Sequence, residues 1–197
     1  WLEFLNNRNK SADIIIPDAY PDFLQWLPNS EKVIRYDKHK ERAEALLNGA
    51  DLIFCLDFNG FGRVDEMQPA LENSPARKIM IDHHIDPQME TVLTVSRPEM
   101  SSTCELVFRI MYQSGDFEKM TKKCAVCLYC GMMTDTGNFS FSFLTPDLFR
   151  AVAALVETGI EVPVIYNNVY NSFTEGRARL FGYVINRKMK IFHRGTV

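Results

Sequence analysis

An acid and two consecutive histidines end a run of apolar residues in the segment KIMIDHHIDP, Lys78 to Pro87. The chain holds only four histidines, and His83 and His84 stand side by side here. Neutral imidazole nitrogens and carboxylate oxygens are the usual ligands of manganese, iron and zinc. A buried histidine often only satisfies backbone groups, but the flanking Asp82 and Asp86 weaken that explanation. The segment therefore predicts a metal site, in which one histidine binds metal while the other meets substrate.

Two further aspartates stand where they could join the histidines. Asp57 follows the apolar run LIFCL, and a carboxylate at the end of a buried strand is costly to desolvate unless it is paired or bound to a cation. For Asp57 taken alone, a helix cap or a salt bridge is the better explanation. Asp135 lies in TDTG, which by itself is typical of a turn in which the aspartate bonds its own backbone. The function of both depends on whether folding brings them to the histidines.

Four apolar, β-branched runs are expected to be the strands that position these residues. They are ADIIIP, KVIRY, ADLIFCLD and RKIMIDHH, at residues 12–17, 32–36, 50–57 and 77–84. Strands that are apolar without alternation are buried on both faces, which indicates a parallel β-sheet flanked by helices, an α/β fold. The carboxyl ends of such strands open into the crevice where ligands bind, so Asp57 and Asp82 should meet there.

Helix signals surround and follow the strands. Capping residues predict the start of three helices: at Asp37, at Ser102 with Glu105 three residues later, and at Thr145 with Pro146. From about residue 119 onward strand signals disappear. The C-terminal third is therefore expected to be mainly helical.

Composition limits the class of protein and its partners. Hydrophobic residues make up 46% and charged residues 24%, which is ordinary globular usage, and no apolar run is long enough to span a membrane. Five cysteines, mostly inside apolar segments, and the lack of a signal-peptide pattern favour a reducing compartment, the cytoplasm. The net charge of −3 gives no overall attraction for nucleic acid, so an anionic substrate needs a local positive source such as metal ions or a few arginines.

Three cysteines leave a different metal site open. Cys124, Cys127 and Cys130 recur every third residue in KKCAVCLYCG, a spacing that superficially suggests an iron–sulfur or zinc site. At helical spacing they can equally be small buried residues, and no second cysteine pair follows. A redox protein of this kind would absorb visible light.

Four segments, taken in order, carry a family resemblance. LIFCLDFN, IDHHIDP, SSTCEL and GMMTDTGNFSF resemble the DHH phosphoesterase family, named for its Asp-His-His triplet. The chain looks most similar to the oligoribonuclease and 3′-phosphoadenosine 5′-phosphate phosphatase (nanoRNase) branch. The resemblance implies a manganese-dependent phosphohydrolase with two divalent cations, Mg²⁺ or Co²⁺ being possible in place of Mn²⁺. Its substrate would be a short single-stranded oligonucleotide or a small phosphorylated nucleotide, and a homo-oligomer is possible.

The resemblance also implies a role for each acid and histidine. Asp57 would bridge the two metals, His83 would ligate one of them, and Asp135 would complete the shell of that ion. His84 would face the substrate phosphate, and Asp82 would fix the tautomer and orientation of the histidines.

Substrate contacts are expected from a helix N-terminus and an arginine. Ser101, Ser102 and Thr103 can offer hydroxyls and backbone amides to a phosphate, although helix capping by Ser102 explains the same residues almost as well. Arg63, in the loop beyond Asp57, is a possible phosphate contact, with a surface role as the alternative.

Two segments expected from the family are missing from the sequence. The first motif, a histidine and two aspartates, belongs before WLEFLNN, and no histidine precedes Asp57 except His39 in a charged helix. We therefore expect residues 1–175 to form a DHH-type catalytic domain without its first strand and first metal motif, and weak or no activity of this chain alone. Residues 176–192 are expected to be a connecting helix, and residues 193–197 the start of a C-terminal substrate-binding domain. A non-catalytic nucleotide-binding or regulatory module of the same fold is the alternative function.

Overall fold

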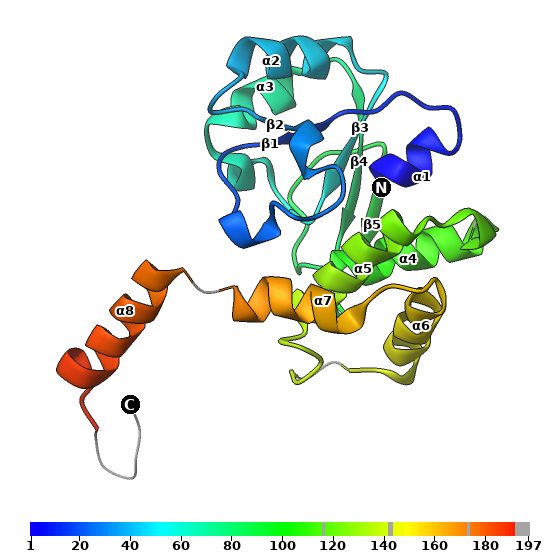
Figure 1. Cartoon of the computed structure of the whole chain (residues 1–197). Helices are drawn as coiled ribbons and strands as arrows, with labels where there is room; N and C mark the ends of the chain where they lie inside the picture. The colour runs from blue at the N-terminus through cyan, green and yellow to red at the C-terminus, as the bar shows by residue number, and fades with distance from the viewer. Residues whose placement is uncertain (116, 142–143, 173, 192–197) are drawn as a thin grey trace.

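Two parallel sheets form the centre of the chain in a computed structural model that describes residues 1–115, 117–141, 144–172 and 174–191 (Figure 1). The strands are β1 (Ile14–Ile16), β2 (Val33–Arg35), β3 (Leu52–Leu56), β4 (Arg77–Asp82) and β5 (Leu93–Ser96). β1 pairs with β2, and the other three pair in the order β3-β4-β5, every pair being parallel. In the described part of the chain, no strand pairing joins the two sheets. The four predicted strands are confirmed, and β5 is an additional edge strand.

Helices make up much of the rest of the described chain. They are α1 (Leu2–Asn6), α2 (Lys40–Gly49), α3 (Gln68–Asn73), α4 (Thr103–Gln113), α5 (Lys122–Asp135), α6 (Pro146–Glu157), α7 (Val162–Tyr166) and α8 (Glu175–Tyr183). Two of them continue as π-helical turns, α7 into Asn167–Asn171 and α8 into Val184–Lys188. The α/β fold and the mainly helical C-terminal third are therefore confirmed.

The carboxyl ends of β3 and β4 lie level with each other. Leu56 is in register with Ile81, and the Asp57 backbone N–H donates to the Ile81 carbonyl at 3.1 Å. Asp57, directly after β3, and Asp82, the last residue of β4, therefore lie at the same edge of the sheet. This register is what places the acids and histidines beside one another.

Strand β4 packs against both halves of the core. Met80 belongs to a cluster with α2 and α3, and Ile81 belongs to a larger cluster with α4, α5 and α6. Because successive side chains of a strand point to opposite faces, the two residues cover both sides of the sheet. Their full burial explains why the sequence of this strand is apolar without alternation.

Two of the three predicted helix caps are confirmed. The Ser102 hydroxyl accepts the Glu105 backbone N–H at 3.0 Å, and the Thr145 hydroxyl accepts that of Leu148 at 3.1 Å. The prediction that Asp37 caps α2 is wrong. Its carboxylate pairs with Arg35 at 2.6 Å, and the helix begins at Lys40 without a side-chain cap.

The three regularly spaced cysteines lie in α5, and Cys124 and Cys130 are buried in the larger core cluster, whereas Cys127 is partly buried. Burial raises the pKa of Cys127 to about 11 and that of Cys130 to about 12, so both remain protonated thiols at neutral pH. Metal ligation needs the thiolate. Within the described residues, the one group of side chains close enough together to hold an ion contains no cysteine. The structure therefore favours the core interpretation.

The lengths and compositions of the helices decide whether any of them could cross a membrane. Across the described ranges of the chain, none of the helices combines the length and apolar character that a membrane span requires.

Helices α4 and α5 approach each other closely at Gly131. A Cβ at this position would lie 2.2 Å from the Cys104 Sγ, whereas one at Gly182, in exposed α8, would meet nothing within 4 Å. We expect Gly131→Ala to lower the free energy of unfolding by about 1–3 kcal/mol through crowding. Gly182→Ala is the matched control, which gains up to about 1 kcal/mol of helix propensity alone. Urea denaturation measures both, and an equal gain in the two variants would contradict the close packing.

Candidate metal centre

Asp57 stands directly after β3 in an unusual backbone conformation. Its φ is 68°, the left-handed region, which costs an L-residue roughly 1–2 kcal/mol. The turn directs the chain out of the sheet and leaves the carboxylate 54% exposed at the sheet edge. Strain that the surrounding structure maintains at an exposed acid is a reason to look for a function there.

His83 faces Asp57 across the carboxyl edge of the sheet. Its Nδ1 lies 3.2 Å from the Met100 carbonyl oxygen, which can only accept, so in the neutral imidazole Nδ1 carries the proton and Nε2 has the lone pair. That Nε2 lies 3.8 Å from an Asp57 oxygen and 3.9 Å from an Asp135 oxygen. These separations are too long for hydrogen bonds. Two atoms that each bind one ion at about 2.1 Å can lie up to about 4.2 Å apart, so a cation fits between them.

Asp135 approaches His83 from a helix rather than from a strand, because it is the last residue of α5. Burial first, and then the charge of Asp57, raise the pKa of its carboxyl above the usual value. Two carboxylates that repel each other beside an imidazole lone pair are a donor set suited to a divalent cation. The chemistry of Asp57, His83 and Asp135 therefore fits a divalent cation. The group whose ligand atoms all lie within 4.8 Å of one another is Asp57, His83 and His84.

His84 is held by a different partner. Its Nδ1 lies 2.8 Å from an oxygen of Asp82, whose side chain is fully buried. The imidazole itself is 37% exposed, so its Nε2 is the nitrogen left for a ligand. The second Asp82 oxygen, also buried, has no hydrogen-bond partner within the described structure. A carboxylate that orients an imidazole in this way supports proton transfer at Nε2.

Comparison with known proteins identifies the family of the chain. The DHH family, N-terminal domain, matches residues 1–132, about two thirds of the chain, including the Asp-His-His triplet. The chain belongs to the DHH family. A solved structure of an exopolyphosphatase-related protein from Bacteroides fragilis is 44% identical, covers 96% of the chain and superposes with a TM-score of 0.93.

Two curated relatives extend the comparison. The bifunctional oligoribonuclease and PAP phosphatase NrnA of Thermus thermophilus is 28% identical over 72% of the chain. An uncharacterized protein of Mycoplasma pneumoniae is 33% identical over 55% of the chain. The alignments cover 40% and 33% of these relatives and 56% of the Bacteroides fragilis protein. The chain thus spans between a third and a little over half of the length of these three relatives.

The geometry leaves His84 a second possible role in this DHH site. One ligand atom from each of Asp57, His83 and His84 lies within 4.8 Å of the others. His84 is therefore close enough to bind the ion itself rather than the substrate phosphate, and metal titration of a His84 variant separates the two roles.

The predicted substrate contacts are engaged inside the protein. The Ser101 hydroxyl donates to Glu105 at 2.7 Å, the Ser102 hydroxyl caps α4, and the Thr103 hydroxyl donates to Asp57 at 2.7 Å. No hydrogen bond or ion pair in the described ranges joins the exposed Arg63 side chain to the acids and histidines. Substrate binding by these four residues stays a prediction.

Sequence reasoning missed two partners of the predicted ligands. The Met100 carbonyl, which fixes the tautomer of His83, carries no side-chain signal at all. The bond from Thr103 to Asp57 joins residues 46 positions apart, so only the fold reveals it. The capping-box spacing of SSTCE is the sequence signal that the turn before α4 is held by hydrogen bonds.

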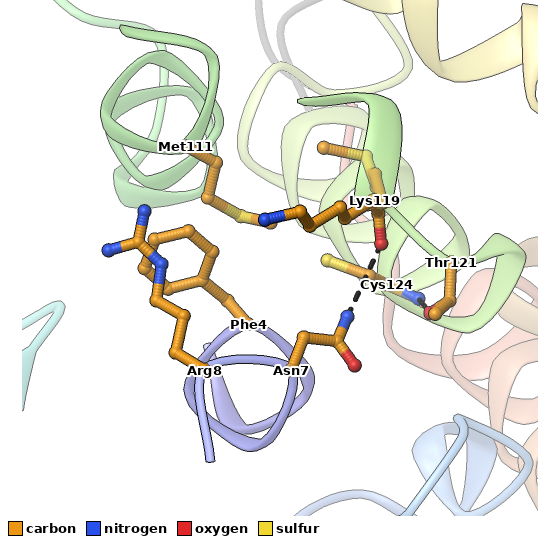
Figure 2. Close-up of a pocket in the computed structure, with 8 residues that line it drawn as sticks. Phe4, Asn7, Arg8, Met111, Lys119, Thr121 and Cys124 are labelled. Atoms are coloured by element: carbon orange, nitrogen blue, oxygen red, sulfur yellow. Dashed lines mark hydrogen bonds between the residues drawn. The ribbon is translucent and has the colours of Figure 1, made fainter. Parts of the chain in front are cut away.

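A small cavity lies between α1, α4 and α5 (Figure 2). Phe4, Arg8, Met111 and Cys124 are among its lining residues, and Asn7 donates to the Lys119 carbonyl across it at 3.3 Å. Its free volume of about 10 Å³ is room for about one water molecule. The cavity is therefore too small for a substrate.

Asp135→Asn is expected to stabilise the metal-free protein. The folded state binds the Asp135 proton more tightly than the unfolded state does, because its pKa is raised above 3.8. The contribution of this proton to the free energy of unfolding is complete below pH 3.8, and it is lost as pH rises through the folded-state pKa of Asp135. At pH 7 the variant should therefore melt at a higher temperature than wild type without metal, and gain less from added Mn²⁺. Asp51→Asn, at an exposed aspartate, is the control. A lower melting temperature for Asp135→Asn would contradict the conclusion that burial and the charge of Asp57 disfavour the Asp135 carboxylate.

Proposed function

We propose that this DHH protein is a metal-dependent phosphoesterase that hydrolyses phosphate esters of short oligonucleotides or bisphosphorylated nucleotides. One observation carries the proposal: the free Nε2 of His83 faces the carboxylates of Asp57 and Asp135 at 3.8 and 3.9 Å. The proposed cofactor is a pair of divalent cations, Mn²⁺ first, which Asp57, His83 and Asp135 would help to hold.

The proposed division of labour follows from the hydrogen bonds. Divalent cations supply charge that polarises the phosphoryl group, lowers the pKa of water and stabilises the leaving oxygen. His83 and Asp135 would bind and orient the cations, since an imidazole nitrogen and a carboxylate oxygen face the site. His84, anchored by Asp82 through Nδ1, would hold the phosphate or give it a proton from Nε2.

The substrate class is proposed by comparison. The Thermus thermophilus relative is named as an oligoribonuclease and PAP phosphatase, and the Bacteroides fragilis relative as exopolyphosphatase-related. Both names describe hydrolysis of anionic phosphate chains or esters, and cations at the site would attract such substrates to a chain of net charge −3. We favour the nucleotide substrates and keep polyphosphate as a comparison arm of the assay.

The domain organisation is proposed on similar grounds. Residues 1–175 would be the catalytic domain, completed by an upstream strand with the first metal motif. The break between the parallel sheets, with β1 and β3 each unpaired on one side in the described structure, leaves edges that such a strand could join. Residues 176–192 would connect to a C-terminal substrate-binding domain that starts at residues 193–197, and residues 192–197 lie outside the described part of the chain. Exposed α8, which lies apart from the sheets in Figure 1, agrees with that role. A cytoplasmic location and a homo-oligomer remain proposals as well.

The test is an assay of the complete gene product with Mn²⁺. Substrates are a dinucleotide, 3′,5′-bisphosphorylated adenosine, bis-p-nitrophenyl phosphate and tripolyphosphate. We expect hydrolysis of the first two that EDTA abolishes and added Mn²⁺ restores. Binding of the nucleotides without hydrolysis of any substrate would instead support the alternative, a non-catalytic nucleotide-binding module.

A further inference from the structure

We propose that Thr103 is a positioning residue, whose hydroxyl fixes the Asp57 carboxylate for metal binding. The proposal rests on the metal site proposed above. It gives the Thr103 hydroxyl a task other than contacting substrate.

Asp57 needs such a partner because little else orients its carboxylate. The side chain is about half exposed, and the backbone of Asp57 adopts the left-handed conformation at the end of the strand. In the described structure, the hydrogen bond that its carboxylate accepts is the one from Thr103, at 2.7 Å. A hydroxyl bound to one oxygen fixes the plane of the carboxylate and limits which lone pairs remain for a cation.

Thr103 is suited to the task by its own environment. It is the first residue of α4 and is buried, with 5% of its surface exposed. A β-branched side chain has few χ1 rotamers, so the direction of its hydroxyl is well defined. At the first position of a helix the hydroxyl does not compete with the hydrogen bonds inside the helix.

The turn that carries Thr103 is itself clamped. Glu105, which is 1% exposed, accepts from the Ser101 backbone N–H at 2.9 Å and from its hydroxyl at 2.7 Å. Arg109 donates to the other Glu105 oxygen, with its Nε at 3.0 Å. The adjacent Met100 carbonyl accepts from His83. One rigid turn at the start of α4 therefore aligns both Asp57 and His83.

The experiment compares Mn²⁺ affinity in matched variants of the complete gene product. Thr103→Val keeps the shape and loses the hydroxyl, and Thr103→Ser keeps the hydroxyl. Thr158→Val removes a hydroxyl at the end of α6 that donates to the Leu155 carbonyl, far from the acids and histidines in sequence. Losing a group behind a metal ligand typically weakens metal binding about 10–100-fold. We expect that loss for Thr103→Val in calorimetric titration, and affinities within about threefold of wild type for the other two.

Three outcomes separate the possibilities. Wild-type protein that binds no Mn²⁺ overturns the proposed function, and the role of Thr103 with it. Wild-type affinity in Thr103→Val overturns only the positioning role, and a raised KM with that unchanged affinity would assign the hydroxyl to substrate. Melting curves of the metal-free variants check folding. If Thr103→Val fails to fold, Thr103→Ala takes its place, and restored affinity in Thr103→Ser remains the deciding result.

Discussion

Replacing His83 with alanine is expected to weaken Mn²⁺ binding by more than about 100-fold, because losing a ligand costs more than losing a group behind one. The value of kcat/KM should fall at least as far, since the cations supply the charge at the reacting phosphate. The physical reason is the tautomer: the Met100 carbonyl holds the Nδ1 proton, so Nε2 is the atom that faces Asp57 and Asp135.

His39 supplies the matched control for this prediction. It is an exposed histidine just before α2, outside the strand-end cluster. His39→Ala should therefore leave Mn²⁺ affinity and kcat/KM within about twofold of wild type, as surface substitutions usually do. Calorimetric titration and steady-state kinetics measure both variants. Equal losses in the two, or none in His83→Ala, would remove His83 from the site.

Replacing His84 with glutamine is expected to have a different signature. If Nε2 of His84 holds or protonates the phosphate, kcat falls by about 10²–10⁴-fold, the usual worth of a general acid or base. Mn²⁺ affinity should change little. The two measurements together distinguish this role from ligation, because the ligand atoms of His84 lie within 4.8 Å of those of Asp57 and His83. A matching loss of Mn²⁺ affinity would make His84 a fourth ligand.

A variant of Asp82 tests the hydrogen bond between Asp82 and His84 from the side of the carboxylate. Asp82→Asn keeps the shape of the side chain but disturbs the hydrogen bond that holds Nδ1 of His84, so kcat should fall by roughly 10–100-fold. Residues that act as a unit are not additive. The double variant with His84→Gln should therefore be no slower than His84→Gln alone. Additive losses would mean that Asp82 acts independently of His84.

The strand-end acids could be predicted because burial on both faces marks a strand clearly. Met80 and Ile81 pack on opposite sides of the sheet, which is why the sequence of β4 is apolar until Asp82. Parallel pairing then makes the ends of β3 and β4 coincide, as the sequence pattern led us to expect. Asp135 was placed by family resemblance instead, because nothing in TDTG itself says which strand end the C-terminus of α5 reaches.

The contacts that the sequence could not predict depend on long-range packing or on local competition. The Thr103 hydroxyl meets Asp57 only because α4 packs against β4. The predicted cap at Asp37 is wrong for a local reason. Arg35, two residues earlier, forms an ion pair with the Asp37 carboxylate. Charge pairing at short range thus outcompeted a capping pattern that was otherwise plausible.

The most direct measurement is anomalous X-ray diffraction from crystals of the complete gene product grown with Mn²⁺. Our account predicts a manganese peak about 2.0–2.3 Å from Nε2 of His83 and from one oxygen each of Asp57 and Asp135, close to the usual metal–ligand distances. A peak bound by other side chains, with these three groups left uncoordinated, would contradict it.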